Sequence, residues 1–100
     1  MNHTVARRRI LQILASPDSR IIHRLHAGDR QRERRVTAGE VHRILRCGAI
    51  VNSPHWDTKF NNWVCQQVEG PDQDGRFVRV VIGIWEDKLQ IAIITVVEVE

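Results

Sequence analysis

The stretch "TAGEVHRILRCGAIVN", residues 37–52, contains a change from helical to strand periodicity, and this change decides the fold class. Thr37, followed three residues later by Glu40, is the capping-box pattern of a helix start. The apolar residues then recur at helical spacing, at Val41, Ile44 and Leu45. Gly48 is typical of the residue just after a helix, and β-branched residues begin at position 50. The pattern therefore predicts a helix followed directly by a strand.

The chain before residue 37 is predicted to be mainly helical. "TVARRRILQILA", residues 4–15, has an apolar face and Thr4 as a candidate N-cap, and Pro17 ends the helix. A second helix is expected from His26 to Arg35. Between them, "RIIHR" at residues 20–24 fits either a helical turn or a short strand, and the sequence does not decide between the two.

The chain after residue 48 is predicted to form strands over 49–52, 60–69, 76–85 and 89–100, separated by turn residues such as Asp74-Gly75. Strict alternation places one set of apolar residues on a single face of the third strand: Val78, Val80, Ile82 and Ile84. In the last strand the same rule sets Ile91, Ile93, Thr95, Val97 and Val99 against Ala92, Ile94 and Val96. The fold class is therefore α+β, with two or three N-terminal helices packed on a three- to four-stranded antiparallel β-meander.

Both of these strands are apolar on both sides near their middles. Such strands are covered on both faces, or they use one face to bind a partner, which includes a second copy in a homodimer. A length of 100 residues is enough for a single domain, here 1–100. Within it, residues 1–20 are interpreted as an added N-terminal helix on a core of 22–99.

The net charge of +3 is distributed unevenly along the chain. Residues 1–50 hold 11 arginines, no lysine and 4 acidic residues, which gives +7, whereas residues 51–100 hold 4 basic and 8 acidic residues, which gives −4. Guanidinium groups fit phosphate oxygens in pairs, so the charged half suggests a polyanion as partner. A GC-rich genome would also enrich arginine without any functional reason.

The sequence argues against a membrane protein and against a disulfide scaffold. No apolar run approaches the ~20 residues of a membrane span, and the N-terminus lacks a convincing signal-peptide cleavage site, so a cytoplasmic location is expected. Cys47 and Cys65 are 18 residues apart with no C-x-x-C partner, which is typical of reduced thiols. His23 and His26 have no third ligand at a telling distance, so we expect neither a metal nor another cofactor.

The most unusual segment is "HRLHAGDRQRERR", residues 23–35. On a helix, His26, Arg30 and Arg34 share one stripe, and the two like charges favour an anion between their heads. The same segment also contains Asp29 with Arg32 and Arg30 with Glu33, pairs three residues apart that form an ordinary salt-bridged surface. Spacing alone leaves both interpretations open.

The string "HAGDRQRERRVTAGEVHRILRCGAIV", followed by "VCQQVEGPDQDGRFVRVVIGI" and "IAIITVVEVE", resembles a family of small bacterial and phage proteins known only as a domain of unknown function. The resemblance covers residues 22–99, and its pattern falls on two sets of positions. The first set is His26, Ala27, Arg30, Arg34, Val36, Thr37, Glu40, Val41, Leu45 and Gly48, and the second is Glu69, Gly70, Asp72, Asp74, Gly75, Thr95 and Val96. Arg35 stands where this family commonly has glycine, and Arg24 stands where a helix-capping serine or threonine is usual.

This family is similar in layout to ribonuclease toxins of the BrnT, RelE and MqsR kind, and the resemblance implies a metal-independent endoribonuclease with a cognate antitoxin as protein partner. It implies that His26 acts as acid or base and that Arg30 and Arg34 stabilise the phosphate. Arg35, Arg79 and Trp63 are implied as further RNA contacts, although a packed core aromatic is the simpler interpretation of Trp63. The alternatives are a non-catalytic module that binds nucleic acid or protein, and a structural subunit that binds no nucleic acid.

Overall fold

The computed structural model describes residues 1–70 and 75–99, apart from the side chains at positions 25, 26 and 99. The predicted Asp74-Gly75 turn therefore lies in part outside the described residues. The described chain forms three helices and five strands, in the order α1 (His3–Ala15), β1 (Arg20–His23), α2 (Leu25–Glu33), α3 (Ala38–Cys47), β2 (Ala49–Asp57), β3 (Asn62–Glu69), β4 (Phe77–Ile84) and β5 (Gln90–Val99).

The five strands form one mixed sheet in the order β1-β5-β4-β3-β2. Strands β2 to β5 pair antiparallel, as the predicted meander requires, and β1 pairs parallel to β5, from Arg20 opposite Gln90 to His23 opposite Ile93. The segment at residues 20–24 is thus a strand, and the sheet has one strand more than the three or four predicted. The fold class α+β is confirmed.

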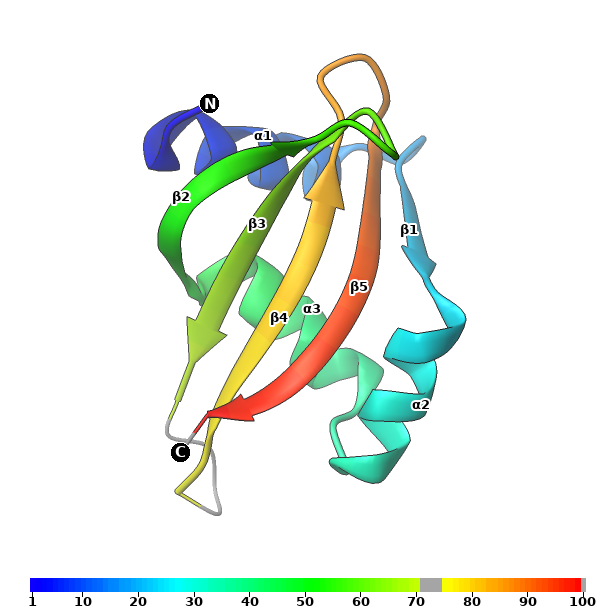
Figure 1. Cartoon of the computed structure of the whole chain (residues 1–100), viewed down its shortest axis with the longest axis vertical. Helices are drawn as coiled ribbons and strands as arrows, with labels where there is room; N and C mark the ends of the chain where they lie inside the picture. Colours follow the sequence, from blue (N-terminus) through cyan, green and yellow to red (C-terminus); the bar gives the residue numbers. More distant parts are fainter. Residues whose placement is uncertain (71–74, 100) are drawn as a thin grey trace.

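Helices α1 and α3 cover one face of the sheet, and α2 lies at its β1 edge (Figure 1). The predicted apolar face of β4 is the one that meets them, because its four alternating residues from Val78 to Ile84 are at most 3% exposed. Residues of α1 (Ala6, Ile10, Ile13) and of α3 (Val41, Ile44, Leu45) belong to the same hydrophobic cluster. The opposite face is only partly covered, and Phe77 there is 43% exposed.

The predicted alternation in β5 is wrong beyond Ile93 because the strand contains a β-bulge. Val81 pairs with Thr95 but Ile82 pairs with Ile93, so Ile94 is an extra residue on β5. The bulge shifts the side chains by one position, and Val96 is therefore buried in the core in place of Thr95. No residue type in this apolar run marks the bulge.

Strand β2 is longer than the predicted 49–52 and continues through residues 53–57, which lie between two of the predicted strands. Its register with β3 shifts between Val51 and His55, where Asn52 has a φ of 63° and Pro54 is buried. The turn that follows β2 lies at residues 58–61. Asp57, the residue before it, stabilises this turn because its Oδ1 accepts hydrogen bonds from the backbone N–H groups of Lys59 and Phe60.

The helix ends follow the sequence signals in part. The Thr37 hydroxyl accepts a hydrogen bond from Glu40 N at 3.1 Å, which confirms the predicted cap of α3. Helix α1, in contrast, begins at His3 with Asn2 as N-cap instead of Thr4. Gly48 ends α3 with a φ of −68° and not in the left-handed conformation. Glycine is needed there because a Cβ would lie 2.6 Å from the carbonyl oxygen of Ile44.

None of the helices in the described part of the chain is long and apolar enough to cross a membrane. Both cysteines are free thiols, with Cys47 exposed and Cys65 buried.

We predict that the two thiols differ strongly in reactivity, because burial raises the pKa of Cys65 to about 11. At pH 8, a disulfide reagent such as DTNB is expected to titrate one thiol per native chain, at Cys47, and the second only after denaturation. A Cys47→Ser variant should then show no fast-reacting thiol. Two thiols reacting at similar rates in the native protein would contradict this placement of Cys65.

Candidate active site

Helix α2 carries ion pairs along its exposed side. The guanidinium of Arg30 contacts the carboxylate of Glu33 at 3.0 Å, and that of Arg32 contacts the carboxylate of Asp29. These are the two pairs that the sequence spacing allowed as an ordinary salt-bridged surface. Arg30 therefore lies on α2 as predicted, with a carboxylate as neighbour.

The first candidate catalytic residue, His26, lies in the first turn of α2, one turn before Arg30. Its side chain lies outside the described residues, so its role stays a prediction. The start of this helix has no side-chain cap, because Arg24 stands at the N-cap position without such a hydrogen bond. Because Arg24 stands where a helix-capping serine or threonine is usual, the first backbone N–H groups of α2 have no side-chain acceptor at the N-cap.

The end of α2 forms a Schellman motif. Val36 N donates to Gln31 O at 2.9 Å, and Arg35 N donates to Arg32 O at 3.3 Å. Arg35 occupies the position at which the chain turns left-handed, with a φ of 54°. Glycine adopts this conformation without strain, whereas an arginine does so at a cost of roughly 1–2 kcal/mol. This geometry explains why glycine suits position 35 and shows that the arginine here is strained.

A hollow of about 590 Å³ lies beside this turn, between the end of β1, α2 and the start of α3. It is lined by His23, Gly28, Gln31, Arg32, Arg35, Val36, Thr37 and Ala38. We call it the β1–α2 cleft. Its lining combines one imidazole and two guanidinium groups, side chains that can act as a general base and stabilise an anion.

The histidine of the β1–α2 cleft is held by a neighbouring amide. His23 Nδ1 lies 2.7 Å from Gln31 Oε1. Because a carbonyl oxygen only accepts hydrogen bonds, Nδ1 is the donor in this contact, and Nε2 is the ring nitrogen that the contact leaves free. A base whose second nitrogen is fixed by a hydrogen bond is the arrangement found in nucleophile-activating sites.

Arg76 fixes the turn that shapes this cleft. Its guanidinium donates to the carbonyl oxygens of Arg34 and Arg35, the latter at 3.2 Å, and it lies 3.6 Å from the Glu40 carboxylate. Arg34 is half-buried, and its Nε has no hydrogen-bond partner among the described residues. The α2–α3 turn is thus hydrogen-bonded to the residue that precedes β4.

The remaining predicted RNA contacts lie elsewhere on the sheet and on opposite faces of it. Trp63 pairs with Ile84, packs against the core and donates through Nε1 to Glu86 at 2.8 Å, as expected for a packed core aromatic. Arg79 lies next to the core residue Val80 in β4 and therefore points to the other face. The structure does not bring these two side chains together, and neither lines the β1–α2 cleft.

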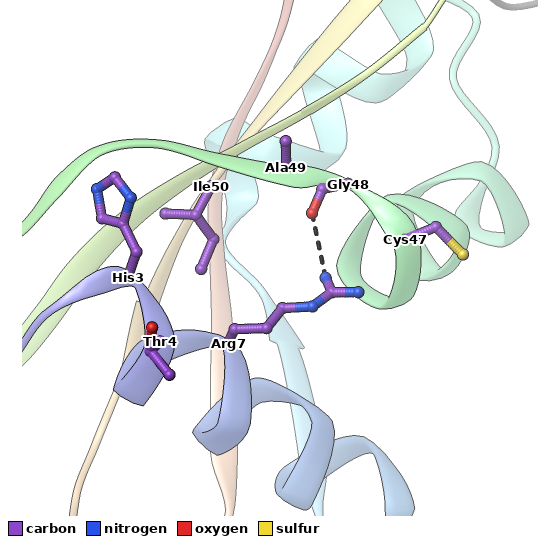
Figure 2. Close-up of a pocket in the computed structure, with 7 residues that line it drawn as sticks. All are labelled: His3, Thr4, Arg7, Cys47, Gly48, Ala49 and Ile50. Carbon is purple, nitrogen blue, oxygen red and sulfur yellow. Dashed lines mark hydrogen bonds between the residues drawn. The ribbon is translucent and has the colours of Figure 1, made fainter.

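A second hollow, of about 470 Å³, lies between α1 and the end of α3 (Figure 2). Arg7 dominates it, and its guanidinium donates to the carbonyl oxygens of Gly48, at 3.1 Å, and of Arg46. Gln67, fully buried, donates to the Leu45 carbonyl at 3.2 Å. These donors satisfy the last carbonyls of α3, so this hollow is a helix-capping structure and we assign no ligand to it.

Sequence reasoning missed His23 and Arg32 as members of a common site. His23 ends a strand and Gln31 lies eight residues later on a helix, so no local spacing indicates that they meet. The only usable signal was the density of charged and imidazole groups in residues 23–35. Among the described residues, no three histidine, cysteine or acidic side chains are grouped as metal ligands would be.

The fold defines a small α+β protein in which helices cover one face of a mostly antiparallel sheet, with the cleft at the sheet's parallel edge. Residues 24–98 match the family model described as "Domain of unknown function (DUF4258)", and the chain belongs to this family. The match runs from the start of α2 to the end of β5 and leaves α1 outside. No curated protein and no solved structure matches the chain, so the likeness to ribonuclease toxins stays a prediction.

Proposed function

We propose that this protein is a toxin-like endoribonuclease that needs no metal and that its active site is the β1–α2 cleft. The observation that carries the proposal is Arg35, an arginine held in a left-handed conformation on the wall of the cleft that also contains His23. Backbone strain is kept where the side chain is needed, and glycine would remove the strain at once. In this proposal the protein acts in the cytoplasm and is neutralised by an antitoxin protein.

The reaction is attack of a ribose 2′-oxygen on the adjacent phosphorus, with departure of the 5′-oxygen. His23 Nε2 takes the proton of the 2′-hydroxyl as its oxygen bonds to phosphorus. Arg32 and Arg35 stabilise the extra negative charge on the phosphate oxygens. The leaving 5′-oxygen receives a proton as its bond to phosphorus breaks, and His26 is the residue we retain for this step. The products are a 2′,3′-cyclic phosphate and a 5′-hydroxyl.

The ion pairs of α2 favour a second candidate, a non-catalytic module that binds nucleic acid or a protein. Asp29 and Glu33 each neutralise a guanidinium of the helix, which lowers the charge available to a reacting phosphate. In such a module the partner is held by charge and by the half-exposed face of the sheet, which also offers a surface for a second copy.

We predict that the protein cleaves labelled single-stranded RNA in EDTA and leaves 2′,3′-cyclic ends. His23→Ala is expected to lower the rate by about a hundredfold or more, as loss of a general base does. His55→Ala is the matched control, because His55 is exposed on β2 at the opposite edge of the sheet.

Equal cleavage by His23→Ala and His55→Ala would remove His23 from the mechanism. His26→Ala and Arg30→Ala, assayed beside them, test the residues that the family resemblance implied. Intact RNA with every variant, together with salt-dependent binding, would favour the non-catalytic module.

A further inference from the structure

A cluster of cations and aromatic rings is formed by side chains from the turn at residues 58–61, from the β4–β5 turn and from the residue that follows β1. We call it the aromatic–cation patch, and it consists of Arg24, Lys59, Phe60, Trp85 and Lys88. In Figure 1 the β2–β3 hairpin crosses in front of β4 and β5 towards β1. The contacts agree, because Arg24 Cζ lies 4.0 Å from the centre of the Phe60 ring and Trp85 Nε1 donates to Phe60 O at 3.3 Å.

Each cation of the patch lies over a ring. Lys59 Nζ is 5.3 Å from the centre of Phe60, and Lys88 Nζ is 5.6 Å from the centre of Trp85. These two residues are the only lysines in the sequence. The arrangement joins positive charge to flat π-surfaces on neighbouring turns.

Among the described residues, the cations of the patch form no ion pairs. Within the described part of the chain, neither Arg24 nor the two lysines has a carboxylate within ion-pair distance, in contrast to Arg30 and Arg32 of α2. Three acids lie on the same turns: Asp57 accepts from the backbone of its own turn, Glu86 accepts from Trp63, and Asp87 directly precedes Lys88. The patch therefore offers three cations that are not held in ion pairs among the described residues, although its net charge is reduced by these acids.

One ring of the patch is well exposed. Phe60 is 41% exposed, whereas Trp85 is half-buried. An acidic peptide would use the cations but not the ring faces. Unpaired bases of a nucleic acid use both, because bases stack on aromatic and guanidinium planes while phosphates bind the cations.

The patch adjoins the β1–α2 cleft through two consecutive residues. His23 lines the cleft on the side of the helices, and Arg24 contacts Phe60 of the patch. An RNA strand bound at Phe60 would have to pass the end of β1 to reach the cleft.

We propose that the aromatic–cation patch binds unpaired bases of single-stranded RNA and that the same strand enters the cleft. The proposal rests on the proposed function only in naming RNA as the nucleic acid and the cleft as its destination.

The test is the affinity for a fluorescent 2′-O-methyl RNA decamer, which lacks the attacking hydroxyl and so cannot be cleaved. Phe60→Ala is expected to weaken binding about tenfold, as loss of one stacked base does. Lys88→Ala should lower the slope of log affinity against log salt by roughly 0.7, the value for one phosphate contact on a single strand. Phe77→Ala is the matched control, because Phe77 is 43% exposed at the other end of β4.

Each outcome decides between the two proposals. If Phe60→Ala binds the decamer as tightly as Phe77→Ala and both fold normally by circular dichroism, the patch proposal is wrong, even when RNA cleavage depends on His23. If binding depends on Phe60 but no RNA is cleaved, the patch stands and the ribonuclease proposal fails. If polyglutamate displaces the decamer from wild type as effectively as unlabelled RNA does, the patch is an acidic-peptide surface and the proposal is overturned.

Discussion

Ile10→Asp is expected to unfold the chain, although α1 lies outside the segment that matches the family model. Ile10 is fully buried against the sheet and α3. Loss of its apolar contacts costs about 2–5 kcal/mol, and a carboxylate buried without a partner adds several kcal/mol more. The sum is comparable with the roughly 5–15 kcal/mol that stabilises a typical domain.

The matched control is Leu11→Asp, one position later on the same helix, because Leu11 is 41% exposed. This substitution is expected to change the free energy of unfolding by less than about 1 kcal/mol. Far-UV circular dichroism with a urea titration at 25 °C distinguishes the two variants. Equal urea midpoints for both would mean that α1 does not belong to the cooperative unit.

Helix α1 also holds distant parts of the chain in place by hydrogen bonds. Arg9 donates to the carbonyl oxygens of Trp85, Glu86 and Lys88 at 2.9, 3.2 and 2.8 Å. These are the residues of the β4–β5 turn that carries part of the aromatic–cation patch. Each hydrogen bond from a charged donor contributes at most about 1.5–3 kcal/mol. Loss of α1 would therefore remove the hydrogen bonds that hold the β4–β5 turn as well as apolar contacts of the core.

The features that the sequence predicted correctly are those with local causes. The cap of α3 depends on two residues three positions apart, and the buried face of β4 depends on strict alternation within one strand. Both patterns are complete within about ten residues, so they can be interpreted without knowing the neighbours. The α+β class follows from them because helical and strand patterns occupy separate halves of the chain.

The features that the sequence did not predict depend on contacts between distant segments. The parallel pairing of β1 with β5 joins residues about seventy positions apart, and four residues with two isoleucines carry no signal for it. The bulge at Ile94 and the continuation of β2 through Pro54 are set by the register with neighbouring strands. The β1–α2 cleft likewise exists only in the tertiary structure, because His23 and Gln31 come into contact only when β1 is part of the sheet.

Arg35→Gly is expected to stabilise the protein and to reduce its ribonuclease activity at the same time. Glycine removes the roughly 1–2 kcal/mol cost of a left-handed arginine. The greater conformational freedom of glycine in the unfolded chain offsets about 0.4–1 kcal/mol of this stabilisation. For a domain of 100 residues, the net gain of up to about 1.5 kcal/mol raises the Tm by several degrees. Loss of a guanidinium that stabilises the phosphate in the transition state should lower the cleavage rate about 10²–10³-fold.

Arg35→Ala separates the two effects, because alanine lacks the guanidinium but keeps a side chain at a φ of 54°. It should lose the same activity as Arg35→Gly and gain no stability. Thermal unfolding and RNA cleavage in EDTA, measured on both variants, give the two readouts independently. A stabilised Arg35→Gly with full activity would show that the arginine is strained for no catalytic purpose. A destabilised Arg35→Gly would show instead that the contacts of the arginine side chain outweigh its backbone strain. Only a gain in stability together with a loss of activity identifies position 35 as a place where strain is retained for the chemistry of the cleft.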